Sequence, residues 1–171
     1  MNSDQTTALK NPQSLPALLV RNAERFGDGR IALREKEFGI WQSVTWRQYL
    51  EHVRDFSLGL ISLGLRPGET LGIIGDNRPE WVYAELAAQA AGAIPFGIFQ
   101  DSILSEVAYI IDHSEAAMLV AEDQERLESQ REVVGGEGRG AVVEGAEAVE
   151  EIEGCVEIAG VKVGKGAVCR I

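Results

Sequence analysis

Between residues 45 and 130, short apolar stretches alternate with longer amphipathic ones, and this alternation limits the possible folds more than any other feature. Residues 71–74, 94–99 and 118–121 each have the length and composition of a buried strand. The segments between them place apolar residues at helical spacing. Strands that are separated by helices pair in parallel and are covered by those helices. The sequence therefore predicts an α/β fold, with a partial Rossmann-like parallel sheet and flanking helices.

Two elements are expected before this region. Apolar residues recur at helical spacing over 14–26, with Ser14 as a suitable N-cap. Residues 31–46 alternate around Gly39, which predicts an N-terminal antiparallel β-hairpin.

Helix boundaries are marked by capping residues. Thr45 and Gln48 fit a capping box, and Gly64 supplies the left-handed residue with which many helices end. Asn77 and Ser102 precede the next two amphipathic segments, so we expect them to cap those helices.

The last 41 residues differ from the rest in composition. Residues 131–171 contain no aromatic residue, no Leu and no Pro, but hold nine of the 19 glycines. Such a segment has little with which to build a core, and its glycines weaken any ordered state. We therefore predict a disordered N-terminus at 1–12, a partial α/β domain at 13–130 and a low-complexity Gly/Val/Glu tail at 131–171.

The tail also suggests an origin. Of its 41 residues, 31 are Val, Ala, Glu or Gly, whose codons all begin with G. An abrupt change near residue 130 is expected of an out-of-frame gene product, and a genuine divergent tail is the alternative. Reading the coding DNA in the other two frames past codon 130 separates the two.

Charge and cysteine content limit the partners and the compartment. The chain carries 16 Lys and Arg against 27 Asp and Glu, a net charge of -11. This balance argues against a nucleic-acid partner and against docking on anionic lipid. No run of 18 apolar residues exists, so no transmembrane segment is expected. With only Cys155 and Cys169 and no export signal, we expect a cytoplasmic protein with reduced thiols.

Two glycine-containing segments do not qualify as phosphate loops. Gly75–Pro79 has one glycine, an acidic residue and a proline, whereas a dinucleotide site needs three spaced glycines. Gly160–Gly166 has too few residues between its glycines and no Ser or Thr after Lys165. We reject both a dinucleotide site and a P-loop.

Other chemistry-bearing residues are isolated. His52 and His113 lie on different predicted helices, with no second ligand at metal-binding spacing, and no His lies near Cys155 or Cys169. The tryptophans are expected to serve packing: Trp41, Trp46 and Trp81.

Two loops are the better candidates for a ligand site. Gly75–Arg78 and Gln100–Ser102 each follow the carboxyl end of a predicted strand, where open α/β sheets place ligands. Turn and cap chemistry explains the same residues, and we favour that interpretation.

Three stretches of the sequence belong together: Leu15–Asp28, Gly75–Trp81 and Gly97–Ser102 followed by Glu106–Glu115. In this order and spacing they resemble the N-terminal region of AMP-forming adenylating enzymes, with long-chain fatty acyl-CoA synthetases as the best match. The resemblance covers about residues 13–130. It implies a reaction in which ATP and a fatty acid give an acyl-adenylate and pyrophosphate, after which coenzyme A takes the acyl group. It also implies Mg²⁺, which offsets phosphate charge.

The motifs that carry this chemistry in the family have no counterpart here. Members have a Ser/Thr/Gly-rich phosphate loop and a Tyr-Gly-x-Thr-Glu segment, whereas this chain has no Thr after Thr70. We assign no catalytic, cofactor-binding or metal-binding residue, and expect ATP, Mg²⁺ and coenzyme A not to bind this chain strongly. The expected function is an N-terminal fragment of a long-chain fatty-acid–CoA ligase that is inactive alone. The alternatives are a non-catalytic interaction module and a subunit completed in trans by a second chain.

Overall fold

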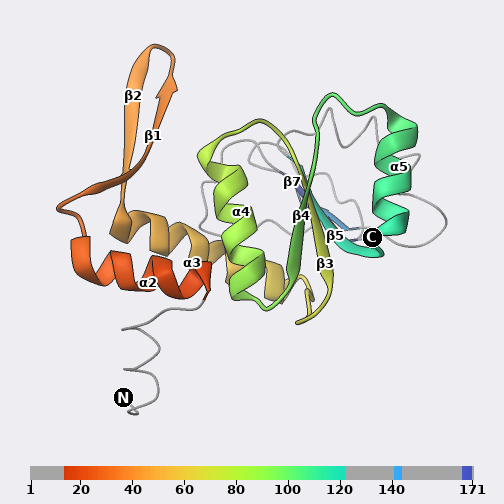
Figure 1. Ribbon diagram of the computed structural model, residues 1–171, viewed down its shortest axis with the longest axis horizontal. Helices are drawn as coiled ribbons and strands as arrows, with labels where there is room; N and C mark the ends of the chain where they lie inside the picture. The colour runs from red at the N-terminus through yellow and green to blue at the C-terminus, as the bar shows by residue number, and fades with distance from the viewer. Residues whose placement is uncertain (1–13, 122–140, 144–166, 171) are drawn as a thin grey trace.

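The computed structural model describes residues 14–121, 141–143 and 167–170 (Figure 1). The helices are α2 (Leu15–Phe26), α3 (Trp46–Ser62), α4 (Pro79–Ala90) and α5 (Leu104–His113). The strands are β1 (Ile31–Glu37), β2 (Ile40–Thr45), β3 (Thr70–Ile74), β4 (Ile94–Ile98), β5 (Ala116–Ala121), β6 (Ala141–Val143) and β7 (Ala167–Arg170). Between residues 14 and 121 this is the predicted succession of elements, so the α/β prediction with an early hairpin is confirmed.

The main sheet has a parallel part and an antiparallel part. β3 pairs in parallel with β4 on one side and with β5 on the other, which places Ile74 opposite both Ile98 and Ala121. β7 pairs antiparallel with β5, and β6 with β7, so the strand order is β4-β3-β5-β7-β6. The two short strands come from the region predicted to be a low-complexity tail. The proposed boundaries at residues 12 and 130 stay predictions.

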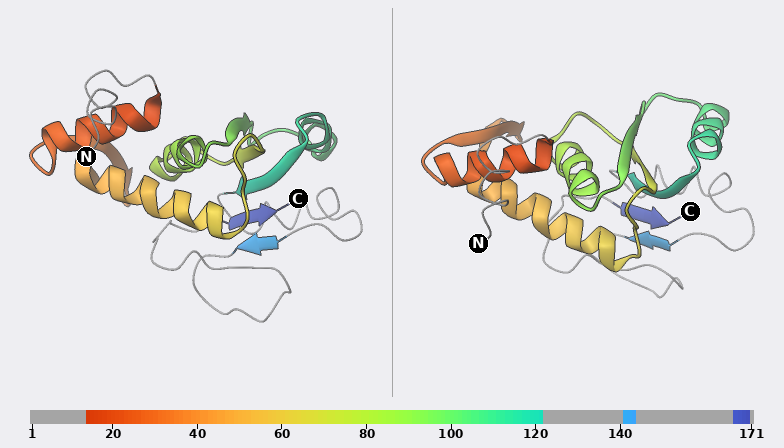
Figure 2. Two further views of the ribbon diagram at one scale, coloured as in Figure 1. Left: turned by 90° about the horizontal axis from the view of Figure 1, so that it is seen from below. Right: turned by 60° about the horizontal axis from the view of Figure 1, so that its bottom comes forward.

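Two apolar cores lie on opposite faces of the sheet (Figures 1 and 2). One joins alternate residues of β3 and β5 to α3 and α4, and the other joins the remaining strand residues to α5. Helix α4 packs closely because its small side chains Ala84, Ala87 and Ala88 are fully buried. At Gly72 the approach is closer still, since a Cβ atom there would lie 2.9 Å from Leu119 Cδ1.

The capping predictions are partly right. Ser14 Oγ accepts a hydrogen bond from the Ala17 backbone N–H at 3.3 Å, as expected. Thr45 Oγ1 accepts from the Gln48 backbone N–H at 3.2 Å, while Gln48 Oε1 accepts from that of Thr45 at 2.9 Å, so the capping box is confirmed.

The predictions of Asn77 and Ser102 as caps are wrong. The cap positions are Arg78 and Ile103, and neither makes a side-chain capping hydrogen bond. Pro79 explains the first shift, because proline favours the first helical position and keeps the residue before it extended. At α5, Glu106 Oε2 accepts from the Ile103 backbone N–H at 3.3 Å instead.

The β1–β2 hairpin projects away from the helices and the sheet (Figure 1). Its two-residue turn consists of Phe38 and Gly39, with φ values of 47° and 81°. Positive φ at both positions is the type I′ geometry that fits the twist of paired strands. At the base, Leu33 and Val44 pack against the core next to α3 and α4. Within the described part of the chain, no helix has the length and apolar character needed to cross a membrane.

Candidate functional site

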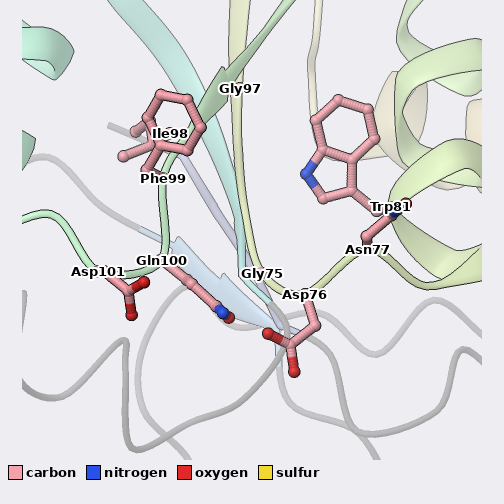
Figure 3. Close-up of a pocket in the computed structure, with 9 residues that line it drawn as sticks. All are labelled: Gly75, Asp76, Asn77, Trp81, Gly97, Ile98, Phe99, Gln100 and Asp101. Carbon is pink, nitrogen blue, oxygen red and sulfur yellow. The ribbon is translucent and has the colours of Figure 1, made fainter.

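A pocket of about 420 Å³ lies where the carboxyl ends of β3 and β4 meet (Figure 3). Its lining residues come from the segments that follow the two strands, from the end of β4 and from the first turn of α4. They are Gly75, Asp76, Asn77, Trp81, Gly97, Ile98, Phe99, Gln100 and Asp101. The two loops that the sequence singled out therefore meet in one site, although they are more than 20 residues apart.

Strand register brings these loops together. Because β3 and β4 are parallel and Ile74 lies opposite Ile98, both chains leave the sheet at the same edge. After β3, the Arg78 backbone N–H donates to the Asp76 carbonyl at 2.8 Å, closing a tight turn before Pro79 begins α4. After β4, the Ser102 backbone N–H donates to the Phe99 carbonyl at 3.1 Å.

Trp81 and Gly97 form an apolar wall of the pocket. A Cβ atom on Gly97 would lie 3.1 Å from Trp81 Cζ2, so the indole lies directly against the backbone of β4. On the other side of that strand Phe99 is 85% exposed (Figure 3). Sequence reasoning did not assign Trp81 or Gly97 to a site. A glycine inside a strand is nevertheless a signal of close approach by another group.

The polar part of the pocket is acidic. The carboxylates of Asp76 and Asp101 and the amide of Gln100 lie on the same side of the opening (Figure 3). The described residues of the lining include no Lys or Arg, so the site offers carboxylate and amide oxygens as hydrogen-bond acceptors beside an aromatic surface.

The turn after β3 is tied to the hairpin by an ion pair. Arg78 Nε lies 2.8 Å from Glu35 Oε1 of β1, and the two side chains are 39% and 23% exposed. In the first turn of α4, Glu80 Oε2 is buried and has no hydrogen-bond partner among the described residues. The pKa of the neighbouring Tyr83 is raised, first by burial and then by the charge of Glu80.

The other candidate residues are dispersed. His52 stacks on Tyr83, with ring centroids 5.0 Å apart, whereas His113 stacks on Tyr109 at 5.4 Å, so the two histidines belong to separate surroundings. Among residues 14–121, 141–143 and 167–170, no group of three potential metal-ligating side chains gathers. Cys155 and the Gly160–Gly166 segment lie outside the described residues.

The three tryptophans have different environments. Trp46 lies between Phe26 and Tyr49, at 6.0 and 6.2 Å between ring centroids, and Trp81 packs partly against the larger core. Packing was predicted for both. The same prediction for Trp41 is wrong, because this side chain is 62% exposed on the hairpin.

Comparison with known proteins places the chain in a family. Residues 19–163 match the family described as AMP-binding enzyme, which is more than half of the chain. The chain belongs to the AMP-binding enzyme family. The match passes residue 130, where the composition changes.

Relatives within the AMP-binding family include much longer proteins. The long-chain-fatty-acid–CoA ligase ACSBG2 of Mus musculus is 32% identical over 119 residues, which is 70% of this chain and 18% of the ligase. The uncharacterized protein Rv1549 of Mycobacterium tuberculosis is 29% identical over 120 residues, which is 70% of this chain and 67% of that protein. The chain thus matches about a fifth of the length of the ligase.

A solved structure supports the fold. The chain resembles the crystal structure of a putative long-chain-fatty-acid CoA ligase from Rhodopseudomonas palustris CGA009, with a TM-score of 0.62 and 23% identity. The likeness covers 74% of this chain and 32% of that one.

The turn after β3 does not fit the phosphates of ATP, and no three potential metal ligands gather among the described residues to hold an associated Mg²⁺. The turn after β3 has a single glycine, a proline that lacks an N–H and the carboxylate of Asp76. A phosphate cradle instead converges several backbone N–H groups with positive charge.

Proposed function

We propose that this chain supplies the N-terminal α/β portion of a long-chain fatty-acid–CoA ligase and does not complete acyl activation by itself. The observation that carries this proposal is the 32% identity with a ligase of that class over 119 residues. The reaction of such a ligase joins a fatty acid to coenzyme A at the expense of ATP, with Mg²⁺. The chain is expected to contribute scaffold and pocket rather than the reacting groups.

Within this function the pocket is proposed to bind a part of the substrates that carries no negative charge. Its aromatic residues Trp81 and Phe99 suit a flat or apolar group, and the described residues of its lining include no Lys or Arg to pair with phosphates. The phosphates of the nucleotide are therefore expected to bind outside this pocket.

A second candidate is a subunit that another polypeptide completes. β4 is the outer strand on its side of the described sheet. Ile94 at its start and Phe99 directly after its end are 56% and 85% exposed. An open edge of this kind is suited to pairing with another chain. This arrangement supports completion in trans by the remaining part of a ligase.

One assay separates these possibilities. The purified full chain is incubated with ATP, Mg²⁺, oleate and coenzyme A, and pyrophosphate release is measured. We expect no release above the protein-free blank, and release by the chain alone would contradict the proposed inactivity. Release that requires an added polypeptide carrying the remainder of a long-chain ligase would favour completion in trans.

The cellular location also belongs to the proposal. We infer a cytoplasmic protein, as the sequence suggested. Fractionation of cells that express a tagged full chain tests this inference, and recovery from an exported fraction would contradict it.

A further inference from the structure

The β1–β2 hairpin projects from the helices and the sheet (Figure 1), and three large apolar side chains at its tip are exposed. Phe38 is 95% exposed, Ile40 65% and Trp41 62%. Scattered single apolar residues are ordinary on protein surfaces, but a projecting tip that gathers three of them is typical of an interaction site. We call Phe38, Ile40 and Trp41 the hairpin tip.

Phe38 contributes little to the stability of the chain that carries it. Its φ of 47° lies in the left-handed region, where a bulky side chain is unfavourable. The first position of a type I′ turn favours Asn, Asp or Gly. Phe38 is therefore an almost fully exposed aromatic side chain in an unfavourable backbone conformation.

Two cations share a face of the hairpin with Trp41. Lys36 pairs with Trp41 across the two strands, and Arg34 pairs with Ser43. Residues that pair directly, and residues two apart on one strand, project from the same face of the hairpin. Arg34 and Lys36 are both exposed. Glu35 projects from the opposite face, where it forms the ion pair with Arg78.

The charges of the chain are unevenly distributed between its two ends. Residues 14–66, which form α2, the hairpin and α3, hold eight Lys or Arg against six Asp or Glu. Residues 67–171 hold seven against 20. The net charge of the whole chain argues against docking on anionic lipid. That net charge, however, averages a weakly basic segment, residues 14–66, with a strongly acidic remainder. Within the hairpin Arg34 and Lys36 balance Glu35 and Glu37, so an anionic surface attracts only the face that carries Arg34, Lys36 and Trp41.

We propose that the hairpin tip docks on anionic membranes, with Phe38, Ile40 and Trp41 entering the bilayer interface and Arg34 and Lys36 facing the headgroups. Aromatic side chains favour the interface, and basic residues beside it are attracted to anionic lipid. A narrow two-stranded tip suits a bilayer better than a protein, because a stable protein interface needs about 800 Å² from each partner. The proposal does not depend on the ligase function.

Vesicle flotation with the full chain tests this docking. The wild type is expected to float with equimolar phosphatidylcholine–phosphatidylglycerol vesicles, to bind pure phosphatidylcholine less, and to lose affinity as salt rises. Phe38→Asn and Trp41→Ser should each weaken binding about tenfold, because each removes a large apolar contact. Arg34→Gln with Lys36→Gln should abolish the preference for the anionic vesicles.

Two controls separate docking from folding. Phe38→Asn creates an Asn-Gly turn, so its melting temperature should equal or exceed that of the wild type while vesicle binding falls. Tyr109→Ser changes a side chain on α5 that is also 65% exposed, and it should bind vesicles as the wild type does.

Three results would overturn the proposal. The first is a folded wild type that does not float with the anionic vesicles. The second is vesicle binding that Phe38→Asn and Trp41→Ser leave unchanged. The third is a dimer in sedimentation that depends on Phe38, without vesicle binding, which would assign the hairpin tip to a second copy of the chain.

Discussion

Trp81 lies so close to Gly97 that a Cβ atom on the glycine would be 3.1 Å from Trp81 Cζ2. The contact joins the first turn of α4 to the backbone of β4. It forms a wall of the pocket at the carboxyl ends of the strands. The position of the indole therefore depends on the absence of a side chain at residue 97.

Gly97→Ala should destabilise the chain, even though alanine is usually better than glycine inside a strand by roughly 0.5–1 kcal/mol. The added methyl group must displace the indole, and such overpacking typically costs about 1–3 kcal/mol. Urea unfolding followed by circular dichroism measures the change in free energy. The double variant Gly97→Ala with Trp81→Phe should lose less than the sum of the single losses, and strict additivity would contradict the contact.

Thr45→Ala should lower the free energy of unfolding by about 1 kcal/mol, because it removes the N-cap of α3. Thr45 Oγ1 accepts from the Gln48 backbone N–H and donates to Asp28 Oδ1 at 2.9 Å. Thr45→Ser keeps the hydroxyl group and is the matched control. Equal losses in the two variants, measured by urea unfolding, would argue that the methyl group matters rather than the cap.

The same substitution should raise the pKa of Asp28. The hydrogen bond from Thr45, followed by that from Arg47, holds the pKa of Asp28 below its ordinary value of 3.8. The associated stabilisation is present above pH 3.8 and is lost as the pH falls through the lowered pKa. Carboxyl ¹³C titration by NMR should show the pKa moving back toward 3.8 in Thr45→Ala. An unchanged value would mean that Thr45 does not hold the carboxylate.

Alkaline pH should destabilise the fold through the buried tyrosines. Burial, with a contribution from Glu85, raises the pKa of Tyr49 from 10.0 to about 12. Because the folded state holds this proton more tightly, the stabilisation is complete below pH 10 and is lost as the pH rises toward 12. Urea unfolding at several pH values should show this fall in free energy. Tyr49→Phe should have a shallower fall than the wild type, and parallel profiles would contradict the assignment.

Glu35→Gln should loosen the turn that lines the pocket. Glu35 and Arg78 are partly exposed, so their ion pair is expected to contribute only about 0.5–1 kcal/mol. Faster hydrogen exchange at the Asp76 and Asn77 amides is the specific readout. Asp55→Asn is the control, because it breaks an exposed ion pair, with Arg54 on α3, that does not involve the turn. If both variants leave exchange at the turn unchanged, the ion pair does not fix that turn.

How far the sequence predicts the fold can be seen at the caps and the tryptophans. The Thr45–Gln48 capping box was predicted correctly because all its atoms lie within four residues. Asn77 was misassigned because the polar residue was given more weight than Pro79, which fixes where α4 begins. Trp41 was misassigned because its exposure depends on how the hairpin stands away from the core.

The sequence by itself determined the alternation of strands and helices, the hairpin and the resemblance to adenylating enzymes. These depend on periodicity, turn residues and short motifs, which act within one element or its neighbours. Only the tertiary structure decided that the Gly75–Arg78 and Gln100–Ser102 loops share a pocket, and that Trp81 lies against Gly97. These relationships depend on the parallel register of β3 and β4, which joins residues more than 20 positions apart and follows from packing the whole sheet.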